Sequence, residues 1–361
     1  MAGAVAVLVA LPSLIAARPA ADAGTSAADL RRAVLASGDV GFSGYAQATG
    51  GLDLPVSDQL TDVADLFSDR TTMRAWYRGS EDWRVDVVRP TGETGVHADA
   101  GGTWTWNYEA ATATRSAPGP LALPAAPDLL PSALGRRLLA EADEEELSRL
   151  GAERIAGRDA LGLRLVPAEE ASSVARVDVW VDGATGLPLR VQVFGEDTAG
   201  SSAEAALDTA FLDLDLTTPL ADVLAFDVPP DADVRQGQAG QLLQAATRAG
   251  EEGDPIALPA QLAGLPRRTI DGAPQTVGVY GRGITLLAVT PVPRRVAAGL
   301  RDAIAAAPEA VVDSLGLRIG AGPLGLMLVR GPEGPVLLAG TVSLDALAQA
   351  ATELAAAGGD R

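Results

Sequence analysis

Residues 73–115 read MRAWYRGSEDWRVDVVRPTGETGVHADAGGTWTWNYEAATATR and contain four of the five tryptophans of the chain. Two sets of apolar residues alternate here with polar ones: Trp83, Val85 and Val87, and then Trp104, Trp106 and Tyr108. Such alternation puts successive side chains on opposite faces of a strand. The runs are separated by turn signals: Gly79–Asp82, Pro90–Gly92 and Asp99–Gly102. The pattern predicts an antiparallel meander with one aromatic face and one more polar face.

An apolar sheet face of this kind must be covered by helices, by a second sheet or by a ligand. Two interpretations are open. The aromatic residues can be ordinary core, since large aromatic side chains are usually buried. Alternatively, an apolar cavity between sheet and helices can hold a lipid-like ligand.

Composition narrows the classes of function. The 361 residues carry 28 arginines, no lysine and 47 acids, for a net charge of −19. This charge argues against nucleic acid as a partner, because binding there requires neutralisation of phosphates. It favours solubility and a basic protein partner. The absence of cysteine excludes disulfides, thiolate catalysis and cysteine metal sites.

Charge and aromatic content divide the chain unevenly. Of the 47 acids, 36 lie up to Gln238, together with 18 of the 28 arginines, and only one aromatic residue, Tyr280, lies beyond Phe226. This shift predicts two units with a polar, glycine-containing linker. The expected divisions are a signal peptide or N-terminal anchor (1–23), a large unit (24–235), a linker (236–260) and a small α+β unit (261–361).

The N-terminus resembles an export signal. Ala2–Ala17 is almost wholly apolar but shorter than the roughly 20 residues of a membrane span. Ala21-Asp22-Ala23 has the small-residue pattern of a cleavage site, although no basic residue precedes the apolar run. Export to the periplasm-like space or cell envelope is therefore expected, with an uncleaved anchor or a buried core segment as alternatives.

Periodicity and turn residues predict the elements outside the meander. In the large unit we expect a helix at Ser26–Ser37, a strand at 41–50, a helix at Ser132–Leu150 and strands around 161–165, 177–181, 187–194 and 210–216. Five prolines between Pro118 and Pro131 indicate a surface loop or lid. The acidic run Glu141–Glu146 is most simply a solvated helix face.

The C-terminal unit has its own pattern, with the order β-β-α-β-β-β-α. The expected elements are strands at 277–280 and 284–290, a helix at 294–307, strands at 315–319, 324–329 and 336–339, and a final helix capped by Ser343.

No catalytic constellation emerges from the sequence. His97 is the only histidine, and no G-x-S-x-G motif supplies a nucleophile, so we expect no enzyme activity. One histidine without cysteine makes a zinc site untenable, and the Asp213–Asp215 carboxylates are more simply a solvated face than a calcium site. No phosphate-binding loop is present. Neither a cofactor nor a metal is therefore expected.

Several segments in this order resemble the LolA/RseB superfamily, and more closely its actinobacterial members. They are FSGYAQ (42–47), RAWYRGSEDWRVDVV (74–88), DAGGTWTWNYEAATATR (99–115), GRDALGLRLVP (157–167), VDVWVDGATGLPLRVQVF (177–194) and LAFDVPPDADV (224–234). The C-terminal residues from LAGLPRR (262–268) onward resemble the tail of those proteins. The hairpin WVDGATGLPLRV is the most specific segment.

The resemblance implies an α+β fold: a strongly curved, half-open antiparallel β-barrel covered by helices, followed by a smaller C-terminal α/β unit. It also implies a non-catalytic protein whose cavity holds an acyl chain or lipoprotein close to a membrane. A regulator that binds an anti-sigma factor or another envelope protein is the alternative. On this basis we expect the cavity walls to come from Trp76, Trp83, Val85, Val87, Trp104, Trp106, Tyr108, Leu189, Val191 and Val193.

Overall fold

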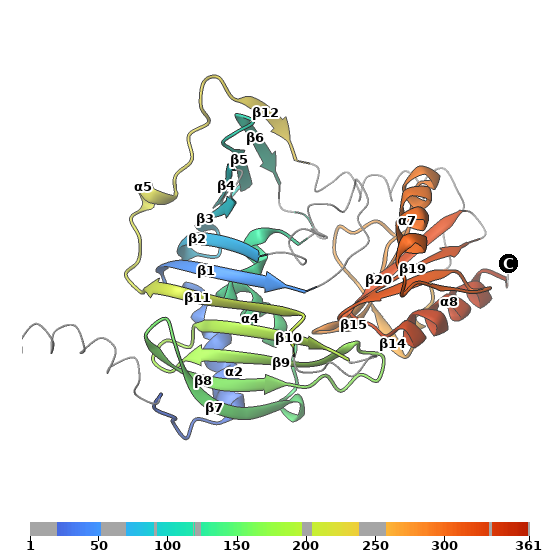
Figure 1. Ribbon diagram of the computed structural model, residues 1–361, viewed down its shortest axis with the longest axis horizontal. Coiled ribbons are helices and arrows are strands. Elements are labelled where there is room, and N and C mark those ends of the chain that lie inside the picture. Colours follow the sequence, from blue (N-terminus) through green and yellow to red (C-terminus); the bar gives the residue numbers. More distant parts are fainter. Residues whose placement is uncertain are drawn as a thin grey trace, which may run out of the picture.

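Two sheets, antiparallel apart from one pair of strands, form the framework of the molecule (Figure 1). The computed structural model describes residues 20–51, 70–89, 92–117, 119, 124–196, 204–237, 258–331 and 334–359. Within these residues a curved twelve-stranded sheet precedes an eight-stranded sheet, and few helices accompany them. The predicted α+β class is confirmed. The large sheet has two edge strands that do not pair with each other in the described part of the chain, so no closed barrel forms.

The large sheet has the order β12-β6-β5-β4-β3-β2-β1-β11-β10-β9-β8-β7. All neighbours are antiparallel except β12 and β6, which are parallel. The bounds are β1 Phe42–Gly50, β2 Arg70–Gly79, β3 Asp82–Arg89, β4 Gly92–Asp99, β5 Gly102–Asn107, β6 Thr112–Ser116, β7 Leu147–Ile155, β8 Arg158–Leu165, β9 Val174–Asp182, β10 Pro188–Gly195, β11 Leu207–Asp215 and β12 Asp233–Gln236.

One face of the large sheet, the inner face, packs against helices α2 (Ala27–Ala36) and α4 (Pro131–Leu139). The helix predicted to start at Ser26 is confirmed, and Ser26 caps α2: the Asp29 amide donates to Ser26 Oγ at 3.1 Å. Helix α4 lies directly on β10. A Cβ added at Gly135 would stand 2.7 Å from Pro188 Cβ, so only glycine permits this approach.

Two predictions for the segment 116–150 are wrong in part. The helix expected at Ser132–Leu150 ends at Leu139, because the chain turns and residues from Leu147 onward pair with β8. The short helix η2 (Ala126–Leu129) precedes α4, and the short helix η3 (Glu144–Glu146) lies between α4 and β7. The end of the proline-rich segment is also not a surface loop: Leu129 and Leu130 are buried in the core under the inner face.

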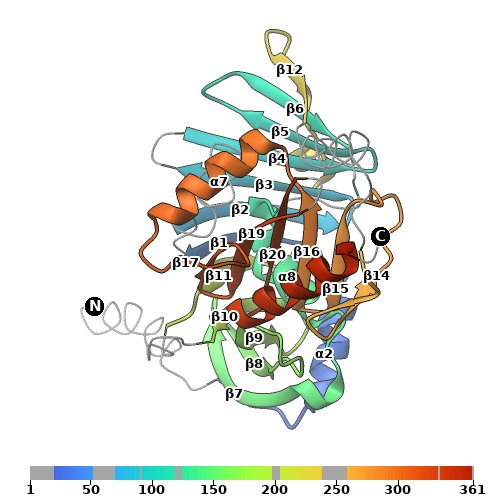
Figure 2. The same ribbon diagram turned by 90° about the vertical axis from the view of Figure 1, so that its right-hand side faces the viewer.

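The small sheet confirms the predicted C-terminal order and adds three short strands. Its strands are β13 Gln261–Leu262, β14 Leu265–Arg268, β15 Gly278–Arg282, β16 Thr285–Pro291, β17 Val311–Val312, β18 Leu317–Ala321, β19 Leu324–Arg330 and β20 Pro335–Gly340. Helix α7 (Arg294–Ala306) packs on one face, against Leu326 and Leu328. Helix α8 (Leu344–Gly359) packs on the other, against Met327 and Leu338 (Figure 2). The Ser343 cap is confirmed by the Ala346 amide, 3.2 Å from Ser343 Oγ.

The apolar run Ala2–Ala17 of the predicted export signal lies outside the described residues. Within the described residues, no helix combines the length and apolar character needed to cross a membrane.

Candidate functional site

Six of the ten residues expected to line a cavity lie on the inner face. Val85, Val87, Leu189, Val191 and Val193 are buried, and Trp83 is half-buried against them. All six belong to, or pack against, one apolar cluster that also contains side chains of α2, α4 and η2. In the described structure these residues are therefore packed against protein.

The other four residues lie on the opposite, outer face: Trp76, Trp104, Trp106 and Tyr108. The register decides this placement. His97 pairs with both Arg84 and Trp104, whereas Val85 pairs with Val96 and lies one residue away along β3. Because directly paired residues share a face, Trp104 lies on the side of Arg84 and opposite to Val85. The expectation of a single aromatic face is therefore wrong, since the two sets of alternating residues lie back to back.

A connecting segment, residues 216–232, covers part of the outer face; we call it the strap. It leads from β11 through the short helix α5 (Ala221–Leu224) to β12 (yellow in Figure 1). Three consecutive strands of the meander each supply a side chain that donates to a strap carbonyl. These are Arg78 to Pro219 (2.6 Å), Arg84 to Val223 (3.3 Å) and His97 to Leu224 (2.9 Å).

Contacts between tilted aromatic rings hold the end of the strap on the sheet. The ring of Phe226 lies 4.9 Å from that of His97, 5.8 Å from Trp104 and 6.1 Å from Trp106, measured between centroids. Aromatic pairs at such distances stabilise a structure beyond the burial of their area. The strap therefore occupies the aromatic surface that the sequence suggested for a ligand.

His97 is buried beneath the strap. It is 5% exposed, and its Nε2 has no hydrogen-bond partner in the described structure. Burial lowers the pKa of His97, and the Leu224 carbonyl and Asp86 oppose that shift only in part. The prediction that His97 has no catalytic role stays a prediction; its place is structural, between a strand and its cover.

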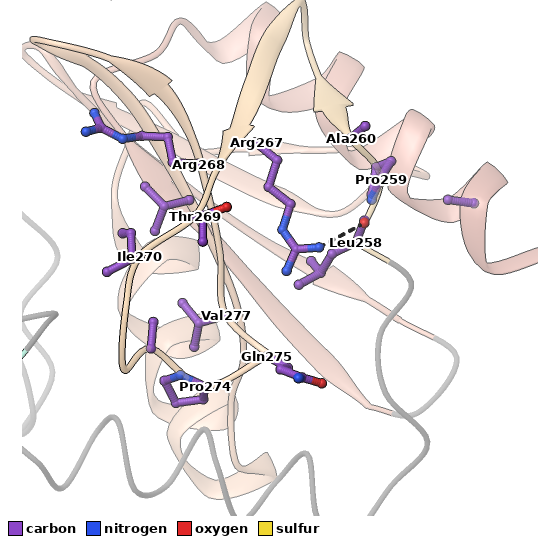
Figure 3. Close-up of a pocket in the computed structure, with 13 residues that line it drawn as sticks. Leu258, Pro259, Ala260, Arg267, Arg268, Thr269, Ile270, Pro274, Gln275 and Val277 are labelled. Atoms are coloured by element: carbon purple, nitrogen blue, oxygen red, sulfur yellow. Dashed lines mark hydrogen bonds between the residues drawn. The ribbon is translucent and has the colours of Figure 1, made fainter.

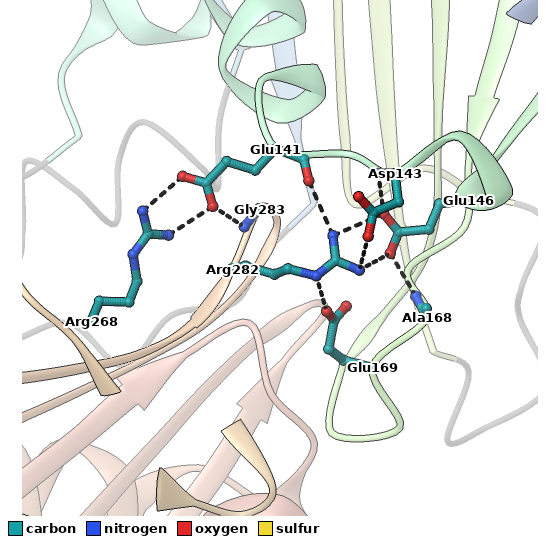
Figure 4. A network of polar contacts seen from close by, with 8 residues as sticks. All are labelled: Glu141, Asp143, Glu146, Ala168, Glu169, Arg268, Arg282 and Gly283. Carbon is teal, nitrogen blue, oxygen red and sulfur yellow. Dashed lines mark hydrogen bonds and ion pairs between the residues drawn. The ribbon is translucent and has the colours of Figure 1, made fainter. Parts of the chain in front are cut away.

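The two sheets meet at a partly buried ion cluster, which the sequence did not reveal (Figure 4). Arg282, at the tip of the β15–β16 hairpin, contacts three carboxylates of the large unit: Glu169 at 2.7 Å, Glu146 at 3.0 Å and Asp143 at 3.2 Å. Its Nη1 also donates to the Glu141 carbonyl at 3.0 Å. The guanidinium is thus saturated by groups from residues 141–169.

Glu146 corrects the interpretation of the acidic run as a solvated face. Its side chain is only 5% exposed, and it accepts hydrogen bonds from the amides of Asp143 and Ala168 as well as from Arg282. Burial raises the pKa of Glu146, but these hydrogen bonds outweigh burial and leave the pKa lowered. The carboxylate is therefore held in its charged form where the two sheets meet. We call this contact region around Arg282 the joint.

Further contacts extend the joint on both sides of Arg282. Glu141 forms a bidentate pair with Arg268 of β14 at 2.7 and 2.9 Å, and it accepts from the Gly283 amide (Figure 4). Away from the charges, Ser172 bridges to Val342, and the Ser173 hydroxyl donates to the Pro323 carbonyl. The small sheet is therefore attached to the large unit by both ionic and main-chain contacts.

An open groove of about 880 Å³ lies on the small unit, beside β14, β15 and the C-terminal end of α8 (Figure 3). It is lined by apolar residues such as Ile270 and Val277 and by two arginines, and none of the ten predicted residues belongs to it. Arg267 donates to the Leu258 carbonyl at 3.3 Å. No group of three or more metal-ligating side chains occurs among the described residues.

The comparisons with known proteins agree with this architecture. The family model described as MucB/RseB N-terminal domain matches residues 119–221. Two further likenesses are to solved structures. MucB from the Pseudomonas aeruginosa MucA/MucB complex is 18% identical, with 90% of this chain and 96% of that chain covered and a TM-score of 0.50. The predicted resemblance to the LolA/RseB superfamily is confirmed.

The second solved structure is a LolA superfamily protein, NE2245 from Nitrosomonas europaea. It is 12% identical, with 56% of this chain and 99% of that chain covered and a TM-score of 0.28. No curated protein matches the chain. The likeness to MucB covers 90% of this chain, and at 18% identity it concerns the fold alone.

Proposed function

We propose that this chain is an exported, non-catalytic envelope protein of the RseB type that binds a segment of an anti-sigma factor or of another envelope protein. The observation that carries the proposal is the joint between the sheets. Arg282 and Arg268 fix the small sheet against the large unit through four carboxylates. Such a joint gives a partner a composite surface with a defined geometry.

The packing of the inner face favours a protein partner over an acyl chain. Val87 and Val191, expected as cavity walls, are 5% and 0% exposed, and helix α4 contacts β10 through Gly135. An acyl chain needs apolar area to bury, at about 0.8 kcal/mol per methylene. Side chains already use that area in the described structure, so a bound chain would have to displace them.

The likeness to MucB supports the same choice. The MucB structure that this chain resembles is a complex with MucA, and the match covers 90% of this chain. The excess of acids in residues up to 238 is suited to a basic segment of a partner. Residues of both sheets are therefore expected to contribute to binding.

Acyl-chain or lipoprotein binding is the second candidate, and one observation favours it. The apolar cluster on the inner face extends from Val85 on β3 to Val193 on β10, as a cavity for a lipid would require. The resemblance to LolA proteins suggests the same ligand class. A lipid would enter only if α4 or the segment around Leu129 moved away from the sheet.

A titration distinguishes the two candidates. Extracytoplasmic segments of the host's membrane-bound anti-sigma factors, made as peptides, are titrated into the full chain by calorimetry. A scrambled peptide of equal charge is the control for non-specific attraction. We expect saturable binding with a Kd of about 1 μM or tighter, or about −8 kcal/mol. If none of the segments binds and the chain takes up a fluorescent fatty acid stoichiometrically, the second candidate holds instead.

A further inference from the structure

We propose that the strap is a pH-releasable cover, and that proton uptake by His97 detaches it from the outer face of the meander. The contacts of His97 make it the centre of this device. It is the only histidine in the chain, its Nδ1 lies 2.9 Å from the Leu224 carbonyl, and its ring contacts that of Phe226. Histidine is the side chain whose charge ordinarily changes between pH 5 and pH 8.

The hydrogen bond determines which nitrogen can take the proton. A carbonyl oxygen accepts, so Nδ1 must carry the hydrogen in the neutral ring. Nε2 is then the unprotonated nitrogen, and it is buried without a partner in the described structure. A proton added there creates an imidazolium that lacks a hydrogen-bond acceptor. Burial of such a charge is costly unless it is paired.

The charged neighbours do not remove this cost. Arg84 on β3 faces His97 and opposes a second positive charge, whereas Asp86 on the same strand favours it. Asp86 is already engaged by Arg84 in a bidentate pair at 2.6 and 2.9 Å. Phe226 of the strap packs against His97, and Trp104, which pairs with His97 across β4 and β5, packs against Phe226; neither ring is titratable.

Release of the strap removes the cost of burying the charged His97 ring, because water can then solvate Nε2. The pKa of covered His97 is lowered below 6.5, and that of the uncovered residue returns toward 6.5. The uncovered state therefore binds more protons between these two values. Stability of the cover is fully present above about pH 6.5 and decreases as the pH falls toward the pKa of the covered state.

Detachment would expose an aromatic surface that carries positive charge. Trp106, now 8% exposed, and Trp104 would lose Phe226, and Arg84 would lose the Val223 carbonyl. The strap occupies this surface with main-chain carbonyls and one aromatic ring. An extended segment of another protein with an aromatic residue has the chemistry to replace it.

The test uses the full chain with labelled histidine. Because His97 is the only histidine, the NMR signals need no assignment. We expect the neutral ring to carry its hydrogen on Nδ1 and to titrate below pH 6.5. Tryptophan emission should shift to the red, and acrylamide quenching should increase, with the same midpoint. His97→Asn keeps a donor near the position of Nδ1 but does not titrate, so its emission should stay constant over this range. Phe226→Ala should show the red-shifted emission already at neutral pH.

The proposal is overturned if the neutral ring carries its hydrogen on Nε2, or if His97 titrates without a change in tryptophan emission. Retention of the emission change in His97→Asn would overturn it equally. Should His97→Asn fail to fold, as judged by circular dichroism, the paired histidine and tryptophan titrations of the wild-type chain decide the question alone.

Discussion

Arg282 Nη2 and Glu146 Oε1 lie 3.0 Å apart, although the two residues are 136 positions apart in the sequence. One belongs to a hairpin of the small sheet and the other to the turn before β7. Breaking a buried ion pair by removing one partner is costly, because the remaining charge keeps its burial and loses its compensation. This pair therefore couples the two sheets energetically as well as geometrically.

Arg282→Ala should destabilise the chain because it leaves Glu146 buried and charged. We expect a loss of about 1–3 kcal/mol in the free energy of unfolding, less than for a wholly buried pair because Arg282 is one-third exposed. Chemical denaturation measures this value. Arg235→Ala is the matched control: its pair with Asp233 is exposed, so a loss below about 1 kcal/mol is expected. Equal losses in both variants would contradict the joint.

The same cluster predicts an acid dependence distinct from that of His97. The pKa of Glu146 is lowered from 4.5, so the unfolded chain binds this proton first. Stability from Glu146 is present above about pH 4.5 and is lost as the pH falls through the folded-state pKa. Arg282→Ala should flatten this part of the stability profile. Parallel profiles for wild type and variant below pH 4.5 would mean that Arg282 does not set the titration of Glu146.

Limited proteolysis tests the division of the chain into two units. The predicted linker, 236–260, should be cut first, and the two fragments should stay together through the contacts of Arg282 and Arg268. In Arg282→Ala they should separate more readily on gel filtration. Immediate separation of the wild-type fragments would show that the joint is weak, whereas unfolding after cleavage would show that the units do not fold independently.

The register of the meander shows what could be predicted from sequence and what could not. Alternation correctly grouped Trp83 with Val85, and Trp104 with Trp106, because it depends only on neighbours within a strand. It could not relate the two groups, since their relative facing depends on pairing across the turns. Asp99 pairs with Gly102, which aligns His97 with Trp104 and sends the two groups to opposite faces.

The joint was missed for a different reason. Glu146 was one of several acids in a row, and a run of charges is ordinarily solvated. Its burial depends on Arg282, far along the chain. One local signal was available: Arg282 lies between Gly281 and Gly283, both with positive φ, which is typical of a tight hairpin tip that presents one side chain.

The turn between β9 and β10 lies close to helix α2, and substitutions at two matched glycines test this contact. Gly186 and Gly157 have φ of +76° and +75°, but only at Gly186 would a Cβ meet another atom, Ala33 O at 2.5 Å. Gly157→Ala should cost about 1 kcal/mol from backbone strain alone. Gly186→Ala should cost clearly more, measured as the difference in denaturation midpoints. Equal costs would show that α2 does not pack on this turn.

The inner face is tested by Val191→Asp, with stability and fatty-acid binding measured on the same preparation. Val191 is fully buried, so an unpaired carboxylate there should cost about 4 kcal/mol or more and unfold much of the protein. Leu212→Asp, at a position 53% exposed on β11, is the control and should change stability by less than about 0.5 kcal/mol. A near-native melt of Val191→Asp with loss of fatty-acid binding would instead identify a lipid cavity.

The most direct test of the proposed function is the calorimetric titration of the full chain with an extracytoplasmic anti-sigma segment, in parallel for wild type and Arg282→Ala. Partner binding through both sheets predicts saturable binding by the wild type, and binding at least about tenfold weaker, or about 1.4 kcal/mol, in a folded Arg282→Ala variant. No binding of any such segment by the wild-type chain, with tight stoichiometric binding of a fatty acid, would contradict the proposed function.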